Sequence, residues 1–124
     1  MCVFLTIRED EMDKIISLKL DVQFRKLYKK GVSSVRPTLV LYSRRNGLDC
    51  CRLGITTSKK IGNAVVRNRA RRRLREIYRF YFDDLRQGYD FIIVARAKTA
   101  VVPFEEIKKD FLRAAQDVGV LANA

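Results

Sequence analysis

The residues of this chain best suited to chemistry are arginines, and the chemistry they suit is the binding of phosphate groups. Six of the nine residues from 67 to 75 are arginines, and Lys59 and Lys60 lie just upstream. Guanidinium groups donate paired hydrogen bonds to phosphate oxygens, and backbone N–H groups at a helix N-terminus donate to them as well. Residues 59–79 hold nine basic residues against a single acid, Glu76. That density favours a nucleic-acid surface over a solvated charged face, which is the ordinary explanation for charge on a helix.

One helix should carry these arginines. Residues 64–85 contain no Gly or Pro, and their apolar side chains recur at the three- and four-residue steps of a one-sided helix. Asn63 is a suitable N-cap, and Gly88 is expected to end the helix in the left-handed conformation. The arginines oppose the helix dipole, and pairs such as Arg67 and Arg71 repel each other at i,i+4. Because these repulsions destabilise the free helix, we expect a polyanion to bind it.

Hydrophobic spacing and turn residues predict the other elements, which alternate between helix and strand. The order is helix–strand–strand–helix–strand–helix, which implies an α+β fold in one small two-layer domain, a mixed sheet packed against helices. The predicted elements are a helix over 22–30 capped by Asp21, strands over 38–43 and 51–57, the arginine helix, a strand over 89–95, and a helix that starts at Pro103 and ends at Gly119.

Three local signals refine this arrangement. Asn46-Gly47 marks a turn between the first two predicted strands. Gly54, inside the second of them, indicates either a bulge or a close backbone approach. The nearly continuous apolar run at 89–95 predicts a strand that is buried on both faces.

Composition excludes several classes of protein and site. The chain has 124 residues, a net charge of +12 and a pI near 10.1, which fits one basic domain with its own core. It has no histidine, and its three cysteines show neither zinc spacing nor a disulfide framework, which suits a reducing, cytoplasmic setting. No run is long enough to span a bilayer. The adjacent acids at 83–84 and 105–106 point about 100° apart on a helix, so we expect surface residues rather than a two-metal site.

Residues 18–121 resemble the protein subunit of bacterial ribonuclease P. The most specific part is the run SKKIGNAVVRNR at 58–69, in which an Arg-Asn-Arg signature follows a lysine-glycine lead-in. The run FRKLY at 24–28, followed by Gly31, resembles the family's first helix. The run DFIIVAR at 90–96 resembles its last core strand.

The resemblance also divides the chain. Met12 stands where members of the family typically begin, so residues 1–11 are expected to lie upstream of the family's usual start. We expect residues 1–15 to form an N-terminal extension, either an extra strand or a disordered tail. Residues 16–124 are then the ribonuclease P protein domain. The apolar run at 3–7 lacks a basic leader and is a poor signal peptide.

Similarity to this family implies a fold, a partner and a reaction. The fold would be a mixed four-stranded sheet with a left-handed β-α-β crossover through the arginine helix, although the general rule predicts a right-handed one. The partner would be a large catalytic RNA, and the substrate would be precursor tRNA, whose 5′ leader is removed by hydrolysis. Mg²⁺ would be bound mainly by the RNA, so no catalytic or metal-binding residue is expected in the protein. Neither DNA nor a membrane is an expected partner.

The resemblance further implies two sets of site residues. Aromatic side chains in a cleft would stack on leader bases without reading their sequence. Without the resemblance, the two aromatic residues of the first helix are equally well explained as core residues at i,i+4, and a strand tyrosine is more often core. The set expected to face the catalytic RNA is Lys59, Lys60, Arg67, Asn68, Arg69, Arg71, Arg72 and Arg75, and the set expected to hold the leader is Phe24, Tyr28 and Tyr42.

Two alternatives share the same charge pattern. A ribosomal or other structural RNA-binding protein would have a similar basic surface, and the RNA bound in a pull-down would distinguish it. A protein-only nuclease would cleave precursor tRNA without an RNA subunit. The signature over 59–75 favours the ribonuclease P subunit over both.

Overall fold

The computed structural model describes residues 21–122 and gives only the backbone for the first four of them. The predicted boundary between an extension at 1–15 and the domain lies outside the described residues. The described elements, in chain order, are α1 (Asp21–Lys30), β1 (Val32–Val35), β2 (Leu39–Arg45), β3 (Arg52–Thr56), α2 (Ala64–Tyr81), β4 (Tyr89–Ala95) and α3 (Phe104–Asp117), with short 3₁₀ turns at Lys59–Ile61, Phe82–Asp84 and Ala97–Ala100.

The sheet has four strands in the order β1-β2-β4-β3. β2 pairs with β1 and β4 in antiparallel fashion, whereas β3 pairs with β4 in parallel. The parallel pair β3–β4 is joined through α2, which is the crossover that the family resemblance implies. Its left-handed sense stays a prediction.

The mixed four-stranded sheet is confirmed, but the helix–strand–strand–helix order derived from spacing was incomplete. It missed β1, a four-residue edge strand of sequence VSSV. Only Ser34 of this strand is buried, and the neighbouring valines are exposed. A strand so short and so little buried has no hydrophobic alternation to reveal it.

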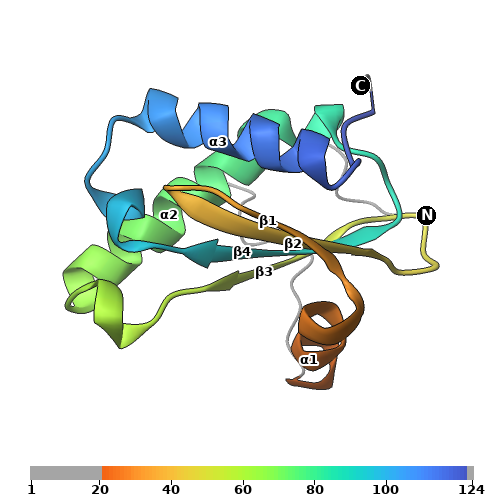
Figure 1. Ribbon diagram of the computed structural model, residues 1–124, viewed down its shortest axis with the longest axis horizontal. Coiled ribbons are helices and arrows are strands. Elements are labelled where there is room, and N and C mark those ends of the chain that lie inside the picture. Colours follow the sequence, from red (N-terminus) through yellow and green to blue (C-terminus); the bar gives the residue numbers. More distant parts are fainter. Residues whose placement is uncertain (1–20, 123–124) are drawn as a thin grey trace.

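One face of the sheet packs against α2 and α3. Figure 1 shows both helices on the same side of the strands. Leu39, Leu41, Phe91 and Ile93 of the sheet join the buried faces of these helices in one core. β4 lies between β2 and β3, and its residues from Asp90 to Ile93 are buried, so the prediction of a strand covered on both faces is confirmed.

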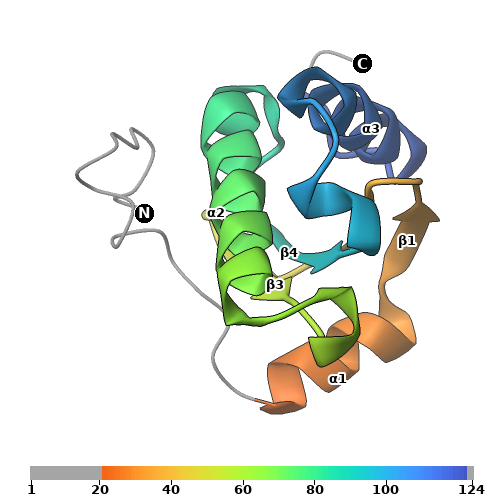
Figure 2. The same ribbon diagram turned by 90° about the vertical axis from the view of Figure 1, so that its left-hand side faces the viewer.

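α1 lies against the opposite face of the sheet, below the strands in Figure 1 and at the bottom of Figure 2. Its buried Leu27 packs on Ile92 of β4, with Tyr42 and Val94 beside them. Because side chains alternate along a strand, Tyr42 and Arg44 of β2 face α1, whereas Leu41 and Ser43 face the main core. The small α1 covers only part of this face.

The arginine helix begins where predicted and ends earlier. The Asn63 Oδ1 atom accepts a hydrogen bond from the Val66 backbone N–H at 3.0 Å, which confirms the N-cap. The helix stops at Tyr81 rather than near Gly88, and a 3₁₀ turn follows. Leu85, predicted as the last apolar residue of the helix, is extended and forms an isolated bridge with Leu121. Its apolar character reflects burial beneath the C-terminal segment.

Two further local predictions have clear outcomes. Gly54 causes no bulge, because the β3–β4 register runs without interruption from Arg52 to Thr56. The last helix begins after Pro103 with two acids in its first turn, and Gly119 follows it with φ of +76°. Its buried face includes Ile107 and Phe111, as the spacing predicted.

Candidate nucleic-acid interface

The predicted RNA-binding side chains of α2 form one exposed cationic surface, which we call the arginine face. Asn68, Arg69, Arg72 and Arg75 are exposed, and Arg67 and Arg71 are half-buried. Among the described side chains, those of residues 25–122, none of these five arginines forms an ion pair with a carboxylate. The like charges on this helix are therefore not neutralised by the described part of the protein. The arginine face comprises Arg67, Asn68, Arg69, Arg71, Arg72 and Arg75.

A hollow of about 650 Å³ runs along the arginine face. Its walls include Val65 and Val101, two valines that are 76% and 73% exposed. Arg71 is held in place at its edge, because its guanidinium donates to Asn68 Oδ1 and to Thr57 Oγ1, both at 2.9 Å. The hollow thus combines cationic donors with apolar side chains, a combination that suits the phosphates and the base faces of a nucleic acid.

Arg73 differs from its neighbours and is not part of the arginine face. Its Nη1 atom donates to the carbonyl oxygen of Thr99 at 2.8 Å, and its guanidinium lies 5.9 Å from the ring centre of Phe104. Burial lowers the pKa of Arg73, and the charge of Arg69 lowers it further. The hydrogen bond of Arg73 therefore links α2 to the 3₁₀ turn at Ala97–Ala100, which follows β4.

Lys59 and Lys60 extend the cationic surface beyond the helix. Both are exposed on the 3₁₀ turn that precedes α2. Gly62 joins this turn to the helix with φ of +147°, and a Cβ atom there would lie 2.8 Å from the Cβ atom of Val66. Only glycine fits this conformation without strain, so it fixes where the two lysines lie relative to the helix.

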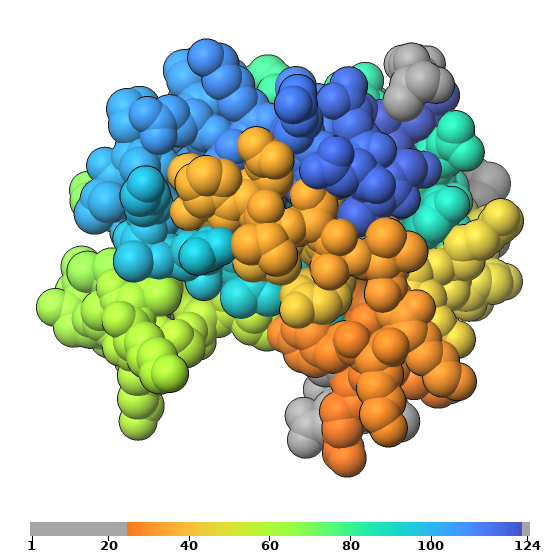
Figure 3. Space-filling model, in the orientation of Figure 1, coloured from red at the N-terminus to blue at the C-terminus, as the bar shows by residue number. Residues whose placement is uncertain are grey.

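Tyr28 and Tyr42, the predicted cleft tyrosines, meet between α1 and the sheet. Their ring centres are 4.8 Å apart and their planes are nearly perpendicular, at 88°. Tyr28 is 42% exposed and Tyr42 is half-buried, so neither is an ordinary core residue. Phe24 lies one helical turn before Tyr28 on α1, and its side chain lies outside the description. Figure 3 shows the surface hollowed between α1 and the yellow-green segment at the start of α2.

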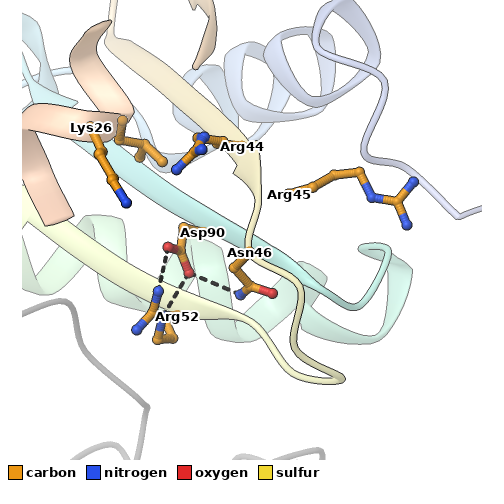
Figure 4. Close-up of a pocket in the computed structure, with 7 residues that line it drawn as sticks. Lys26, Arg44, Arg45, Asn46, Arg52 and Asp90 are labelled. Atoms are coloured by element: carbon orange, nitrogen blue, oxygen red, sulfur yellow. Dashed lines mark hydrogen bonds and ion pairs between the residues drawn. The ribbon is translucent and has the colours of Figure 1, made fainter. Parts of the chain in front are cut away.

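A second cationic pocket, of about 440 Å³, was missed from the sequence. Asp90 lies in it and accepts two hydrogen bonds from Arg52, at 2.8 and 2.7 Å. Asn46 donates to the same carboxylate at 2.9 Å (Figure 4). The bond with Asp90 raises the pKa of Arg52 despite partial burial. Lys26, Leu27, Arg44 and Arg45 complete the lining.

The signal for this pocket was present but weak. Lys26, Arg44 and Arg52 are single basic residues on three different elements, so no run of charge marks them. Arg44 of β2 and Arg52 of β3 become neighbours only because both pair with Asp90 of β4, which lies between them in the sheet. Such pairing depends on strand order, which spacing alone does not give.

Among the side chains that the structure describes, no three from His, Cys, Asp or Glu are grouped to hold a metal ion. Asp83, Asp84, Glu105 and Glu106 are exposed, as predicted for surface acids. No helix in this part of the chain is long and apolar enough to cross a membrane.

Comparison with known proteins gives a consistent result. Residues 12–119 match the family model described as Ribonuclease P. The chain is 37% identical over 102 residues to the ribonuclease P protein component of Natranaerobius thermophilus, covering 82% of this chain and 89% of that protein. It is 40% identical over 100 residues to the corresponding protein of Clostridioides difficile, covering 80% and 88%. The solved structure of the Staphylococcus aureus ribonuclease P protein superposes with a TM-score of 0.75 at 31% identity, over 85% of this chain and 96% of that one.

Proposed function

Because the chain belongs to the ribonuclease P protein family, whose members are subunits of an endoribonuclease that contains RNA, we propose that it binds both the catalytic RNA and precursor tRNA. The arginine face, with Lys59 and Lys60, binds the catalytic RNA. Phe24, Tyr28 and Tyr42 bind the 5′ leader. The complex then removes the leader to give the mature 5′ end of tRNA in the cytoplasm.

The observation that carries this proposal is the unpaired charge of the arginine face. Five arginines are spread over the solvent side of one helix without a carboxylate partner among the described side chains. A free protein gains nothing from that arrangement, because like charges at i,i+3 and i,i+4 repel. When a polyanion binds, the same arginines contribute favourably, because each contact with a phosphate is attractive and releases a condensed counterion.

The two tyrosines support the leader assignment in a different way. Tyr28 is 42% exposed beside the cationic side chains of α1, and the half-buried Tyr42 packs against it with the two rings nearly perpendicular. Base–aromatic stacking is worth about 1–3 kcal/mol per base and tolerates any sequence, because every base has an apolar face. A cleft of this kind suits an unpaired leader better than a duplex.

The chemistry belongs to the RNA subunit in this proposal. Mg²⁺ bound mainly by that RNA would supply an activated water for phosphodiester hydrolysis. This chain's own residues bind RNA, hold the leader extended and reduce the repulsion between the phosphates of two RNAs. The absence of histidine from the sequence leaves it without the commonest general base.

A reconstitution experiment tests the function. The full chain is combined with a bacterial ribonuclease P RNA at low magnesium, and leader removal is measured with and without the protein. We expect the protein to be required under these conditions, and we expect the protein without RNA to cleave nothing. Cleavage by the protein alone would support a protein-only nuclease. Recovery of ribosomal RNA from a pull-down would support a structural RNA-binding protein instead.

A further inference from the structure

β1 is an outer strand of the sheet, and its free edge is uncovered. Among the described residues, no strand pairs with the side of β1 that faces away from β2. Figure 3 shows the lighter orange segment that contains β1 at the surface below α3, and Figure 2 shows β1 at the margin of the sheet. A strand in this position carries a row of backbone donors and acceptors with which another extended chain can pair.

The register of the β1–β2 hairpin identifies the backbone groups at the free edge. The Arg36 N–H donates to the Leu39 carbonyl at 2.8 Å, so these two residues form a hydrogen-bonded pair. Such pairs alternate along antiparallel strands, so Ser34 bonds to β2 as well. The N–H and carbonyl groups of Ser33 and Val35 therefore point outward, away from β2.

The side chains of β1 also favour pairing at this edge. Val32 is 57% exposed and Val35 is 64% exposed, although valine suits a strand best when neighbouring side chains cover it. Ser34 is buried, and its hydroxyl donates to Asp117 of α3 at 2.8 Å. This bond helps to hold β1 extended in the free protein, which lowers the entropy cost of pairing with a partner.

The charges around β1 favour an acidic partner. The exposed Lys30 lies two residues before the strand, and Arg36 follows its last residue. Arg96 lies beside the same end, because its Nη1 atom donates to the Arg36 carbonyl at 3.2 Å. The two α3 carboxylates that contact the hairpin, Asp110 and Asp117, already accept hydrogen bonds from its hydroxyl groups. Acidic side chains at both ends of an incoming strand would therefore meet cations.

We propose that the free edge of β1 binds an extended, acidic segment of a partner protein, which adds to the sheet as a fifth strand. The outward backbone groups of Ser33 and Val35 form the new hydrogen bonds, and the exposed valines of β1 pack against the partner. β1 and β3 form opposite edges of the sheet, so this site is separate from the arginine face on α2, which follows β3. The inference goes beyond the proposed function and does not depend on it.

A second copy of the chain suits this edge less well. Antiparallel pairing of two β1 strands centred on Ser34 would place Val32 of one copy opposite Arg36 of the other. Lys30 of the first copy would then lie two strand residues, or about 7 Å, from that arginine. These like charges, and the net charge of +12 on each copy, oppose self-association.

Nuclear magnetic resonance of the full chain tests the proposal with a peptide probe. The probe alternates valine and threonine over about seven residues, with glutamate at each end. A control peptide has the same sequence but carries N-methyl groups on alternate amides, so it keeps the charge and loses strand hydrogen bonds. We expect the probe, and not the control, to shift the amide signals of Ser33 and Val35 and to slow their hydrogen exchange roughly tenfold.

Val35→Pro is the matched change in the protein. Proline removes the outward N–H of Val35 and none that β2 uses, and edge strands tolerate proline at such positions. Val35→Pro should weaken binding of the probe roughly tenfold, whereas Val35→Thr should keep the wild-type affinity within about twofold. Circular dichroism checks the folding of both variants, and the N-methylated peptide tests the same hydrogen bonds in the wild-type protein.

Three results would overturn the inference. Equal binding of the N-methylated peptide, or signal shifts confined to the arginine face, would show that charge alone explains binding. Slow exchange of the Ser33 and Val35 amides without peptide, if it depends on protein concentration, would identify a second copy at the edge. Slow exchange that does not depend on concentration would identify another segment of this chain as the occupant.

Discussion

Arg69 and Arg73 are four residues apart on one helix, yet we expect alanine at the two positions to have opposite effects. Arg69 is exposed and has no hydrogen bond or ion pair within the described residues. Arg73 donates to the Thr99 carbonyl and lies over Phe104. Arg69→Ala should weaken RNA binding while leaving the free protein slightly more stable. Arg73→Ala should destabilise the protein while changing RNA binding little.

The magnitudes follow from the neighbours of each side chain. Arg69 stands at i,i+3 and i,i+4 from Arg72 and Arg73, and each like-charge pair costs about 0.2–0.5 kcal/mol. Arg69→Ala should therefore raise the free energy of unfolding by about 0.4–1 kcal/mol at low salt. A hydrogen bond to a charged group contributes about 1.5–3 kcal/mol. Arg73 has only one such like-charge neighbour, Arg69, so the relief of repulsion is about 0.2–0.5 kcal/mol, and Arg73→Ala should lower the free energy of unfolding by about 1–3 kcal/mol.

Two measurements distinguish the expected effects of Arg69→Ala and Arg73→Ala. Urea denaturation of the free protein gives the stability change at low and at high salt, and the gain for Arg69→Ala should shrink as salt screens the repulsion. Titration with ribonuclease P RNA over a range of salt gives the number of phosphate contacts. The slope should fall by about 0.7–0.9 for Arg69→Ala and stay unchanged for Arg73→Ala. If Arg69→Ala destabilises the protein and leaves the slope unchanged, Arg69 is structural and the reasoning about the arginine face is refuted.

Three further predictions concern other parts of the chain. Phe24→Ala should weaken binding of precursor tRNA by the reconstituted holoenzyme roughly tenfold and leave mature tRNA unaffected, and equal losses on both would exclude a leader role. Gly62→Ala should lower the urea midpoint, because the left-handed conformation and the contact with Val66 are both unfavourable for a Cβ atom, and an unchanged midpoint would contradict this. Burial, with the charges of Glu105 and Asp84, raises the pKa of Tyr81 in the folded protein. The protonated Tyr81 therefore contributes stability that is complete below about pH 10 and is lost as the pH rises through its pKa in the folded protein. Tyr81→Phe should weaken the alkaline loss of stability, and ultraviolet titration should show one tyrosine fewer ionising late.

Much of the fold was predictable because its longer elements obey local rules. The period of apolar residues in α2 and α3, the cap at Asn63 and the run at 89–95 all depend on residues near each other in sequence. The C-terminal end of α2 was not predictable in this way. Leu85 continues the helical period, but it is extended, lies in the main core and forms a bridge with Leu121, which lies far along the chain.

The exposed surface of the candidate site was predictable to the extent that its residues are adjacent in sequence. The arginine face is one run of charge on one helix, so its composition alone indicated phosphate binding. The meeting of Tyr28 and Tyr42 was expected only from the family resemblance, since nothing in the spacing brings α1 to β2. Arg52 and Asp90 are neighbours because β3 and β4 pair in parallel across α2, a long-range arrangement that no local pattern specifies.

The arginine face and the pocket around Asp90 differ in how firmly their arginine side chains are held within the protein, and this difference changes the entropy cost of binding an anion. Arg52 is fixed by Asp90, so a phosphate bound there would cost little additional side-chain entropy. Arg69, Arg72 and Arg75 have no fixed partners among the described residues, so each loses about 0.5–1.5 kcal/mol of rotamer freedom when RNA orders it. Arginines without fixed partners can adapt to an irregular anionic surface that offers many contacts. A fixed arginine cannot adapt in this way, but it defines the position of an anion bound to it.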